Sequence, residues 1–349
     1  MNYYPEEIPR HLTYPNTPLH NLLEEAAQRY PAAAATSFFG STMSYSELNR
    51  EANRFAHALK AAGLDARDRV AIHLPNCPQL LISLYGTLKA GGVATMVSPL
   101  YEKREIVYQL KDSGAAIMVT LSQKDIFNKA VAAGQEAHLR QLIVTSIKDC
   151  FPLHMRSLFT LFKEKKGGHR ATPDPSLGHV TYNHFLRGKP ETKPGTPVDP
   201  HASAVLQYTG GTTGIPKAAE LSHTNHIANL YQTRAWLHDL KEAEENTLLV
   251  LPLFHVYALT CLNLSVHMAA KTILLPRFDL YEVLNAIEQE KPTLFPGIPA
   301  MYAAINHSLD RAQDKGGKTP DLSSIRICIS GSDKLPVEVQ NRFVELTCG

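Results

Sequence analysis

No part of this 349-residue sequence is a long apolar run. A transmembrane helix needs about 18 or more consecutive apolar residues, and no such stretch occurs. The chain begins MNYYPEEIPRHLTYP, which has no basic start followed by an apolar segment. We therefore expect neither a transmembrane helix nor a signal peptide.

Cysteine is scarce and dispersed. The five cysteines are Cys77, Cys150, Cys261, Cys328 and Cys348, and no two of them form a CxxC pair. This spacing argues against a zinc ribbon, a thioredoxin-type site and a disulfide framework. A reducing cytoplasm is the predicted compartment.

An excess of charge of one sign is also lacking. Lys and Arg number 35, Asp and Glu number 33, and the formal net charge is +2. Such a chain has no electrostatic basis for nucleic acid as its main partner. Hydrophobic residues make up 44% and charged residues 19%, which excludes global disorder. The length predicts two domains, or three, at roughly 100–200 residues each.

Apolar segments of two kinds alternate in the first half. Short apolar runs rich in branched residues predict strands at 68–74, 93–98, 115–121 and 140–146. Segments whose apolar residues have helical spacing predict helices at 78–92, 103–114 and 124–135. An amphipathic helix precedes them, with Leu48, Ala52, Phe55 and Leu59 on one stripe and Gly63 as its stop signal. Strands that alternate with helices predict βαβ units in a parallel sheet.

The second half repeats this alternation after a break. Residues 147–200 include a Pro- and Gly-rich stretch and predict an insertion or linker. Strands are then predicted at 203–209, 247–253, 271–276, 292–297 and 323–332, with helices at 225–237, 255–269, 279–291, 299–309 and 337–346. We expect an α/β fold of two adjacent doubly wound sheets, with a first subdomain at 1–200 and a second at 201–349. Ligands should bind where the carboxyl ends of the strands meet.

The segment Tyr208–Lys217, YTGGTTGIPK, contains the residue types that a polyphosphate cradle needs. It follows a predicted strand. Its three glycines let backbone N–H groups approach an anion, its threonines add hydroxyl donors and potential Mg²⁺ ligands, and Lys217 adds positive charge. The Walker A spacing GxxxxGK[ST] cannot be laid on it. An ordinary glycine turn with incidental threonines is the alternative.

The run YTGGTTGIPK, followed by LSH, resembles the phosphate-loop signature of the adenylate-forming superfamily, which includes acyl-CoA synthetases, luciferases and peptide-synthetase adenylation domains. Other segments resemble the family's motifs in the family's order. They are MSYSELN (43–49), LKAGGVATMVSPLY (88–101), LPLFHVYAL (251–259), FPGIPAMYAAI (295–305) and SGSDKLPVEV (330–339). Within the superfamily the sequence is most similar to bacterial long-chain fatty acid–CoA ligases.

The resemblance implies the fold of the N-terminal domain of these enzymes and a two-step reaction. The fatty acid carboxylate attacks the α-phosphorus of ATP, and the thiol of coenzyme A then displaces AMP from the acyl-adenylate. Fatty acid, ATP and CoA are the implied partners, and Mg²⁺ is the implied cofactor. The rate should come from positioning and from neutralising charge on the departing pyrophosphate.

The resemblance also implies roles along the loop. Thr212 is expected to bind Mg²⁺ and the β- and γ-phosphates, and Lys217 to add charge. The residues expected to wrap the phosphates are Thr209, Gly210, Gly211, Thr213 and Gly214. The sequence departs from the common pattern at Gly210, where Ser is frequent, and at Ala218, where Gly is usual.

Three further groups carry implied roles. His255 would lie beside the acyl carboxylate and the thiol path, and with Thr212 and Lys217 it completes the catalytic candidates. The acyl channel would be lined by Phe254, His255, Tyr257, Leu259, Phe295, Met301 and Tyr302, and the adenine side by Gly331, Ser332 and Asp333. For His255 the alternative is a core histidine. For the acyl-channel residues it is ordinary core packing, and for the adenine-side turn it is a plain strand–helix connection.

Two other patterns allow a choice between function and packing. His223 and His226 stand three residues apart, and we prefer surface histidines at a helix start to a metal site. Phe151–Lys166 places Phe151, Met155, Leu158, Phe159 and Phe162 on one helical stripe flanked by basic residues. Such a helix suits a membrane surface, which predicts peripheral contact at the inner membrane. A helix packed on its own domain is the alternative.

The last expectation concerns the end of the sequence. In the superfamily a Gly-Tyr-Gly-x-Thr-Glu segment, a ribose-binding Asp and a C-terminal domain with a catalytic Lys follow the position of Gly349. The resemblance thus implies a truncated N-terminal part with weak acyl-adenylate formation. The alternatives are a catalytically incomplete nucleotide- or acyl-binding fragment and a ligase for another carboxylic acid. An uncovered sheet edge would favour pairing with a second copy.

Overall fold

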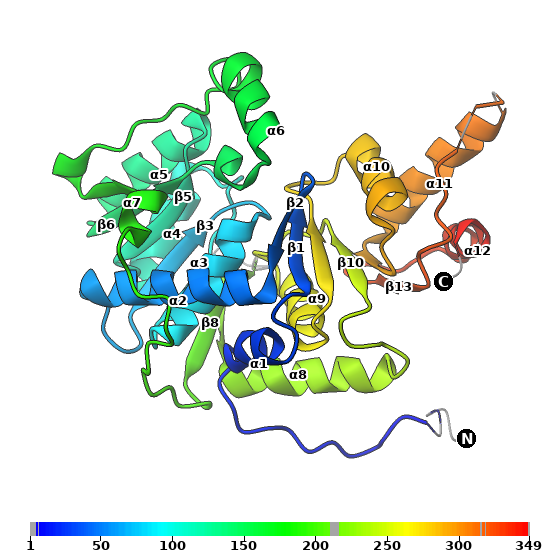
Figure 1. Cartoon of the computed structure of the whole chain (residues 1–349), viewed down its shortest axis with the longest axis horizontal. Helices are drawn as coiled ribbons and strands as arrows, with labels where there is room; N and C mark the ends of the chain where they lie inside the picture. Colours follow the sequence, from blue (N-terminus) through cyan, green and yellow to red (C-terminus); the bar gives the residue numbers. More distant parts are fainter. Residues whose placement is uncertain (1–4, 6, 210–215, 315, 318, 348–349) are drawn as a thin grey trace.

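The computed structural model describes residues 5, 7–209, 216–314, 316–317 and 319–347. In Figure 1 two sheets lie side by side, with helices packed on their faces. This arrangement confirms the expected α/β fold of two adjacent sheets. Within the described ranges, no helix combines the length and the apolar character needed to cross a membrane.

The first sheet contains, in the described ranges, seven strands in the order β7-β6-β5-β3-β4-β8-β9. Their bounds are β3 (Arg69–His73), β4 (Val93–Met96), β5 (Ile117–Leu121), β6 (Gln141–Thr145), β7 (His179–Thr181), β8 (Ser203–Thr209) and β9 (Lys217–Ser222). All neighbours are parallel except β8 and β9, which form an antiparallel hairpin at the sheet edge.

The second sheet has the described strand order β13-β12-β10-β11-β1-β2. Its strands are β1 (Ala34–Phe38), β2 (Ser41–Ser44), β10 (Asn246–Leu249), β11 (Lys271–Leu274), β12 (Leu294–Gly297) and β13 (Ile327–Ser330). Among the described strands of this sheet, only β1 and β2 pair antiparallel. The antiparallel pairs in both sheets make them mixed rather than purely parallel.

The predicted boundary at residue 200 does not separate the two sheets. Strand β1 comes early in the chain but pairs with β11, with Thr36 opposite Thr272. Strand β8 comes after residue 200 but pairs with β4, with Val205 opposite Ala94. Both pairings join segments far apart in sequence, and local hydrophobic patterns carry no information about them. The hairpin that bears the predicted phosphate loop therefore belongs to the first sheet.

Helices cover both sheets. Their bounds are α1 (Asn21–Arg29), α2 (Tyr45–Ala61), α3 (Pro78–Lys89), α4 (Lys103–Ser113), α5 (Lys124–Glu136), α8 (His223–Trp236), α9 (Val256–His267), α10 (Leu280–Glu290), α11 (Pro299–Asp314) and α12 (Val337–Leu346). A capping box starts α2, because the Ser44 hydroxyl accepts from the Glu47 N–H and the Glu47 carboxylate accepts from the Ser44 N–H. Helices α2 and α3 cross closely at Gly86, where a Cβ atom would lie 2.8 Å from the Ala52 carbonyl oxygen.

One apolar core runs through both sheets. It joins Val70 and Ile72 of β3 to Leu248 and Leu249 of β10, all fully buried. A second, smaller core lies under α4 and α5 and includes Ile106, Leu110, Met118, Ala130 and Leu142. Because the larger core is shared, the two sheets pack as one unit and their loops are held in register with each other.

Residues 147–200 are not merely an insertion or linker. They contain α6 (Leu153–Leu158), a π-helical turn η2 (Phe159–Lys163), β7 and α7 (Tyr182–Leu186). Strand β7 extends the first sheet, and the Tyr182 ring stacks on Phe55 of α2 with centroids 5.6 Å apart. These elements are too short to show a clear helical or strand periodicity in the sequence.

The histidine pair at the start of α8 was also predicted wrongly. His223 and His226 are 2% and 4% exposed, so neither is a surface residue. The Leu19 N–H donates to His223 Nδ1 at 3.1 Å. Burial lowers the pKa of both imidazoles to about 4. In the described part of the chain, no group of three or more His, Cys, Asp and Glu side chains is arranged to hold a metal.

Candidate functional site

The hairpin of β8 and β9 presents the predicted phosphate loop. Thr209 pairs with Lys217 across the hairpin, and the Thr209 hydroxyl donates to the Lys217 carbonyl oxygen at 3.4 Å. Both residues are exposed. The loop residues Gly210, Gly211, Thr212, Thr213 and Gly214 lie outside the described residues. The hairpin thus brings one predicted threonine and the predicted lysine to the two ends of this loop.

Ala218, where the superfamily usually has Gly, lies in regular strand pairing. It stands opposite Tyr208 in β8, and it is not among the residues with positive φ. Since the position uses ordinary strand geometry, alanine fits there without backbone strain.

Helix α4 holds the base of the hairpin on one side. The Tyr108 hydroxyl donates to the Pro216 carbonyl oxygen at 2.9 Å, and the Tyr208 hydroxyl donates to Asp112 Oδ2 at 2.6 Å. The two tyrosine rings meet edge to face at 6.5 Å. Burial, and then the hydrogen bond to the Asp112 carboxylate, raises the pKa of Tyr208 far above its usual value. The residues that flank the loop are therefore tied to α4 at both ends.

Gln207 connects the hairpin to the segment that contains His255. Its side-chain amide nitrogen donates to the Phe254 carbonyl oxygen. Gln207 is 3% exposed, and the bond itself is partly buried. Sequence reasoning missed Gln207, although a glutamine inside a buried strand just before the loop was a visible signal.

Asn76 is the second residue that sequence reasoning missed. It follows β3 and reaches the end of β10 and the segment after it. Its Nδ2 donates to the Leu251 carbonyl oxygen at 2.9 Å and to the Leu249 carbonyl oxygen at 3.3 Å, and its Oδ1 accepts from the Leu253 N–H at 2.9 Å. Gln207 and Asn76 both come from the first sheet. Together they position the 250–255 segment of the second sheet against the hairpin.

His255 lies at the start of α9 and is not a core histidine. Its side chain is exposed and forms no hydrogen bond to another described residue. The imidazole and the Phe254 ring have centroids 4.8 Å apart. Partial burial lowers the pKa of His255 below its ordinary value. A largely neutral imidazole with a free edge is therefore available next to the hairpin at neutral pH.

The predicted acyl-channel residues divide into two sets. Phe254 and Tyr257 are partly buried, whereas Leu259, Phe295, Met301 and Tyr302 are buried in the main core. The Tyr257 hydroxyl donates to the Ile329 carbonyl oxygen at 2.6 Å. The Tyr302 hydroxyl donates to the Phe295 carbonyl oxygen at 2.8 Å. The Tyr302 hydroxyl also donates to the Ile329 carbonyl oxygen at 2.9 Å, so Tyr257 and Tyr302 meet at β13, and the Phe295 ring packs on Tyr302.

The predicted adenine-side turn follows β13 directly. Gly331 packs so tightly on Tyr257 that an added Cβ atom would lie 2.9 Å from the ring carbon Cε1. Ser332 has a φ of 71°, a conformation that costs a residue other than Gly on the order of 1 kcal/mol. The Asp333 carboxylate accepts from the Lys334 N–H at 2.7 Å. The turn therefore has a defined backbone shape beside the acyl-channel candidates.

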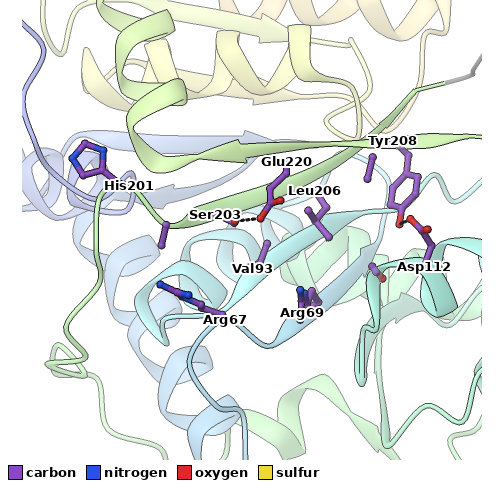
Figure 2. Close-up of a pocket in the computed structure, with 12 residues that line it drawn as sticks. Arg67, Arg69, Val93, Asp112, His201, Ser203, Leu206, Tyr208 and Glu220 are labelled. Carbon is purple, nitrogen blue, oxygen red and sulfur yellow. Dashed lines mark hydrogen bonds between the residues drawn. The ribbon is translucent and has the colours of Figure 1, made fainter.

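A groove of about 500 Å³, which the sequence did not predict, lies along the hairpin. Figure 2 shows Arg67 and Arg69 on one side of it and Ser203, hydrogen-bonded to Glu220, on the other. Tyr208 also lines the groove. The groove follows β8 from its first residue to the residues beside the loop.

Comparison with known proteins identifies the family of the chain. Residues 23–349 match the sequence profile described as "AMP-binding enzyme". The chain belongs to the AMP-binding enzyme family. The resemblance seen in the motifs is thereby confirmed.

Three known proteins are similar to this AMP-binding chain in sequence or in structure. A long-chain-fatty-acid–CoA ligase of Bacillus subtilis (strain 168) is 40% identical over 99% of the chain and 60% of its own length. The structure of a long-chain-fatty-acid-CoA ligase from Archaeoglobus fulgidus superposes with a TM-score of 0.80 at 19% identity, covering 99% of this chain and 63% of that one. The anthranilate CoA ligase AuaEII superposes with a TM-score of 0.79 at 22% identity, covering 97% and 59%.

These comparisons bear on the fold and on length. The two solved structures share the fold of the chain at low sequence identity. The chain spans about 60% of the length of the Bacillus relative.

Proposed function

We propose that the protein is a long-chain fatty acid–CoA ligase. A fatty acid carboxylate oxygen attacks the α-phosphorus of ATP, and the bond from that phosphorus to pyrophosphate breaks. The thiol of CoA then attacks the acyl carbonyl carbon, loses its proton, and AMP leaves. The similarity to a protein named long-chain-fatty-acid–CoA ligase over 99% of the chain supports this proposal.

The observation that carries the proposal is the partly buried Gln207–Phe254 hydrogen bond. It holds the end of a Gly/Thr-rich hairpin next to the segment with His255. The two reactants of the first step, ATP and the acid, need such adjacent sites because the chemistry depends on in-line positioning. Two sheets that share one core provide a fixed frame for that alignment.

The residue roles are proposals of the same kind. Thr209, Gly210, Gly211, Thr213 and Gly214 would wrap the phosphates, Thr212 would bind Mg²⁺, and Lys217 would add charge. His255 would face the acyl carboxylate. Phe254, Tyr257, Leu259, Phe295, Met301 and Tyr302 would shape the acyl pocket, and Gly331, Ser332 and Asp333 the adenine side. When bound, Mg²⁺ would neutralise phosphate charge, and the described Thr209 and Lys217 supply a polar, cationic setting that fits a metal–phosphate group.

We also propose a cytoplasmic protein that touches the inner membrane surface through residues 151–166. Exposed apolar side chains in this segment support the contact, since patches of this kind mark interaction sites. A homo-oligomer that uses the same surface is the competing arrangement.

Binding of stable acyl-adenylate mimics tests the ligase proposal on the purified chain. Palmitoyl-, benzoyl- and aminoacyl-sulfamoyl adenosine would be titrated by calorimetry. We expect the palmitoyl compound to bind most tightly, and palmitate to support more ATP–pyrophosphate exchange than benzoate or an amino acid. Tighter binding of the benzoyl or aminoacyl compound would identify a different acid. No binding of any adenylate would refute the ligase assignment.

A further inference from the structure

A cluster of exposed apolar side chains lies between β6 and β7, where α6 runs into the π-helical turn η2. Leu153 is 82% exposed, Leu158 54%, Leu161 74% and Phe162 69%. We call these four side chains the apolar tip. In Figure 1 the α6 segment stands out at the top of the molecule. Soluble proteins rarely leave so many large apolar side chains together in water without a partner.

Aromatic packing holds this segment in a defined orientation. The Phe151 ring stacks on Phe38 at 5.9 Å and meets Phe39 edge to face at 5.4 Å. The Phe159 ring contacts Phe151 at 5.3 Å and His169 at 5.1 Å. Phe151 and Phe159 occupy the side of the segment that faces the protein. The side chains of the apolar tip therefore point to solvent instead of packing in the core. The predicted single stripe, which grouped Phe151 and Phe159 with Phe162, is therefore wrong.

The acidic residue of the segment is turned inward as well. Glu164 is 5% exposed, and its carboxylate lies 2.5 Å from Lys148 Nζ and 3.6 Å from Arg170 Nε. Burial by itself raises the pKa of Glu164, but the hydrogen bond from Lys148 and the two cations outweigh it, so the pKa lies below its usual value. Lys165 and Lys166, in contrast, are exposed.

The charge that remains outside is therefore positive. Residues 151–170 contain five basic residues and a single acidic one, Glu164. Apolar side chains beside exposed lysines match a bilayer surface, where acyl chains take up the apolar groups and anionic headgroups attract the cations. A folded protein partner would need an apolar groove with an acidic rim, whereas an anionic bilayer offers both features over its whole surface.

We propose that the apolar tip inserts into an anionic lipid bilayer, with Lys165 and Lys166 among the headgroups. This inference rests on the membrane contact proposed above and deepens it, because it names the side chains that enter the lipid and the charge of the lipid that holds them. Phe151 and Phe159 stay within the protein.

Vesicle flotation of the purified chain tests the proposal. The vesicles consist of phosphatidylcholine alone or of phosphatidylcholine with phosphatidylglycerol. The test variant is Leu161→Ser combined with Phe162→Ser. The matched control is Tyr281→Ser, which removes a 76% exposed apolar side chain from α10. Since all three positions are exposed, the variants should fold, which circular dichroism would verify.

We expect flotation with the anionic vesicles and not with the neutral ones. The tip variant should lower the partition coefficient at least about tenfold, and the control should leave it unchanged. Replacing Lys165 and Lys166 with Glu should weaken binding, as should added salt.

Four results would overturn the proposal. They are no flotation of the parent chain, equal flotation of the tip variant, equal binding to neutral vesicles, and a switch from dimer to monomer in the tip variant without any flotation. The last result would make the tip an interface between two copies. Adenylate binding is measured without lipid, so a failure of the ligase proposal would be distinguishable from a failure of this one.

Discussion

Asn76 offers the sharpest test of how the two sheets cooperate. Its side chain is 1% exposed. It forms three hydrogen bonds to the end of β10 and the segment that follows, to the carbonyl oxygens of Leu249 and Leu251 and to the Leu253 N–H. Replacing Asn76 with Ala removes all three bonds and leaves a small cavity where the two sheets meet.

The cost follows from the partners left behind. The Leu249 carbonyl oxygen keeps a bond from the Leu275 N–H at 3.3 Å, so it is not orphaned. The Leu251 carbonyl and the Leu253 N–H form no other hydrogen bond to a described residue, and both lie in buried residues. Each orphaned buried group costs about 1–3 kcal/mol. We therefore expect Asn76→Ala to lower the free energy of unfolding by about 2–6 kcal/mol, a large part of the about 5–15 kcal/mol typical of a folded protein.

Asn76→Asp separates hydrogen bonding from volume. An ionised carboxylate of the same shape still accepts from the Leu253 N–H but faces the Leu251 carbonyl without a proton to donate. The pKa of this carboxyl should therefore be raised in the folded state. Such a group favours folding at low pH, and its contribution is lost as the pH rises above the unfolded value of about 3.9. The free energy of unfolding of the Asp variant should thus be closer to that of the parent chain at pH 5 than at pH 8.

Urea denaturation followed by circular dichroism measures the free energy of unfolding. Calorimetry with the palmitoyl-adenylate mimic measures the affinity of the site for this compound. The matched control is Asn306→Ala, a 6% exposed asparagine with one bond, to the Val339 carbonyl oxygen at 2.9 Å. The control should lose stability and keep its affinity for the mimic. A loss below about 1 kcal/mol in Asn76→Ala, or an unchanged affinity in that variant, would refute the reasoning.

Three other expectations can be checked with the same methods. Gly331→Ala should cost about 1–3 kcal/mol in urea denaturation, because its Cβ atom would press on the Tyr257 ring, and the cost should vanish in a Tyr257→Ala background. Tyr108→Phe removes the donor to the Pro216 carbonyl oxygen and should weaken Mg·ATP binding severalfold in calorimetry, with a stability loss of at most about 1 kcal/mol; unchanged affinity would show that α4 does not position the loop. Burial lowers the folded-state pKa of His73 from 6.5 to about 3, so stability should fall by up to about 1.4 kcal/mol per pH unit between pH 6.5 and pH 3, and His73→Gln should flatten this dependence.

The alternating pattern of the chain predicted most of the parallel strands and their crossover helices. Segments such as 68–74 and 115–121 combine branched side chains with turn signals at both ends, and these features act over a few residues. Strands β1, β2, β7 and β9 escaped prediction for the same reason. They are short or half exposed, and they form because a neighbouring strand pairs with them.

The candidate site was predicted in part. The run from Thr209 to Lys217 and the position of His255 stood out in the sequence. Of these residues, the structure places Thr209 and Lys217 opposite each other in one hairpin, and His255 in the adjoining segment. Gln207 and Asn76 did not stand out. Their role depends on carbonyl groups of a distant segment, and the identity of one residue carries no record of the partner that folding brings to it.

The sequence by itself determined the local elements, the phosphate-loop motif and the membership in the AMP-binding enzyme family, because each depends on residues that are close together in the chain. Only the tertiary structure decided which strands from each half of the sequence join which sheet, which histidines are buried and which apolar side chains of the α6 segment face water. Those features depend on pairing and burial between distant segments. The exposed tip shows the difference: its apolar residues were visible in the sequence, but the aromatic packing that turns four of them outward was not.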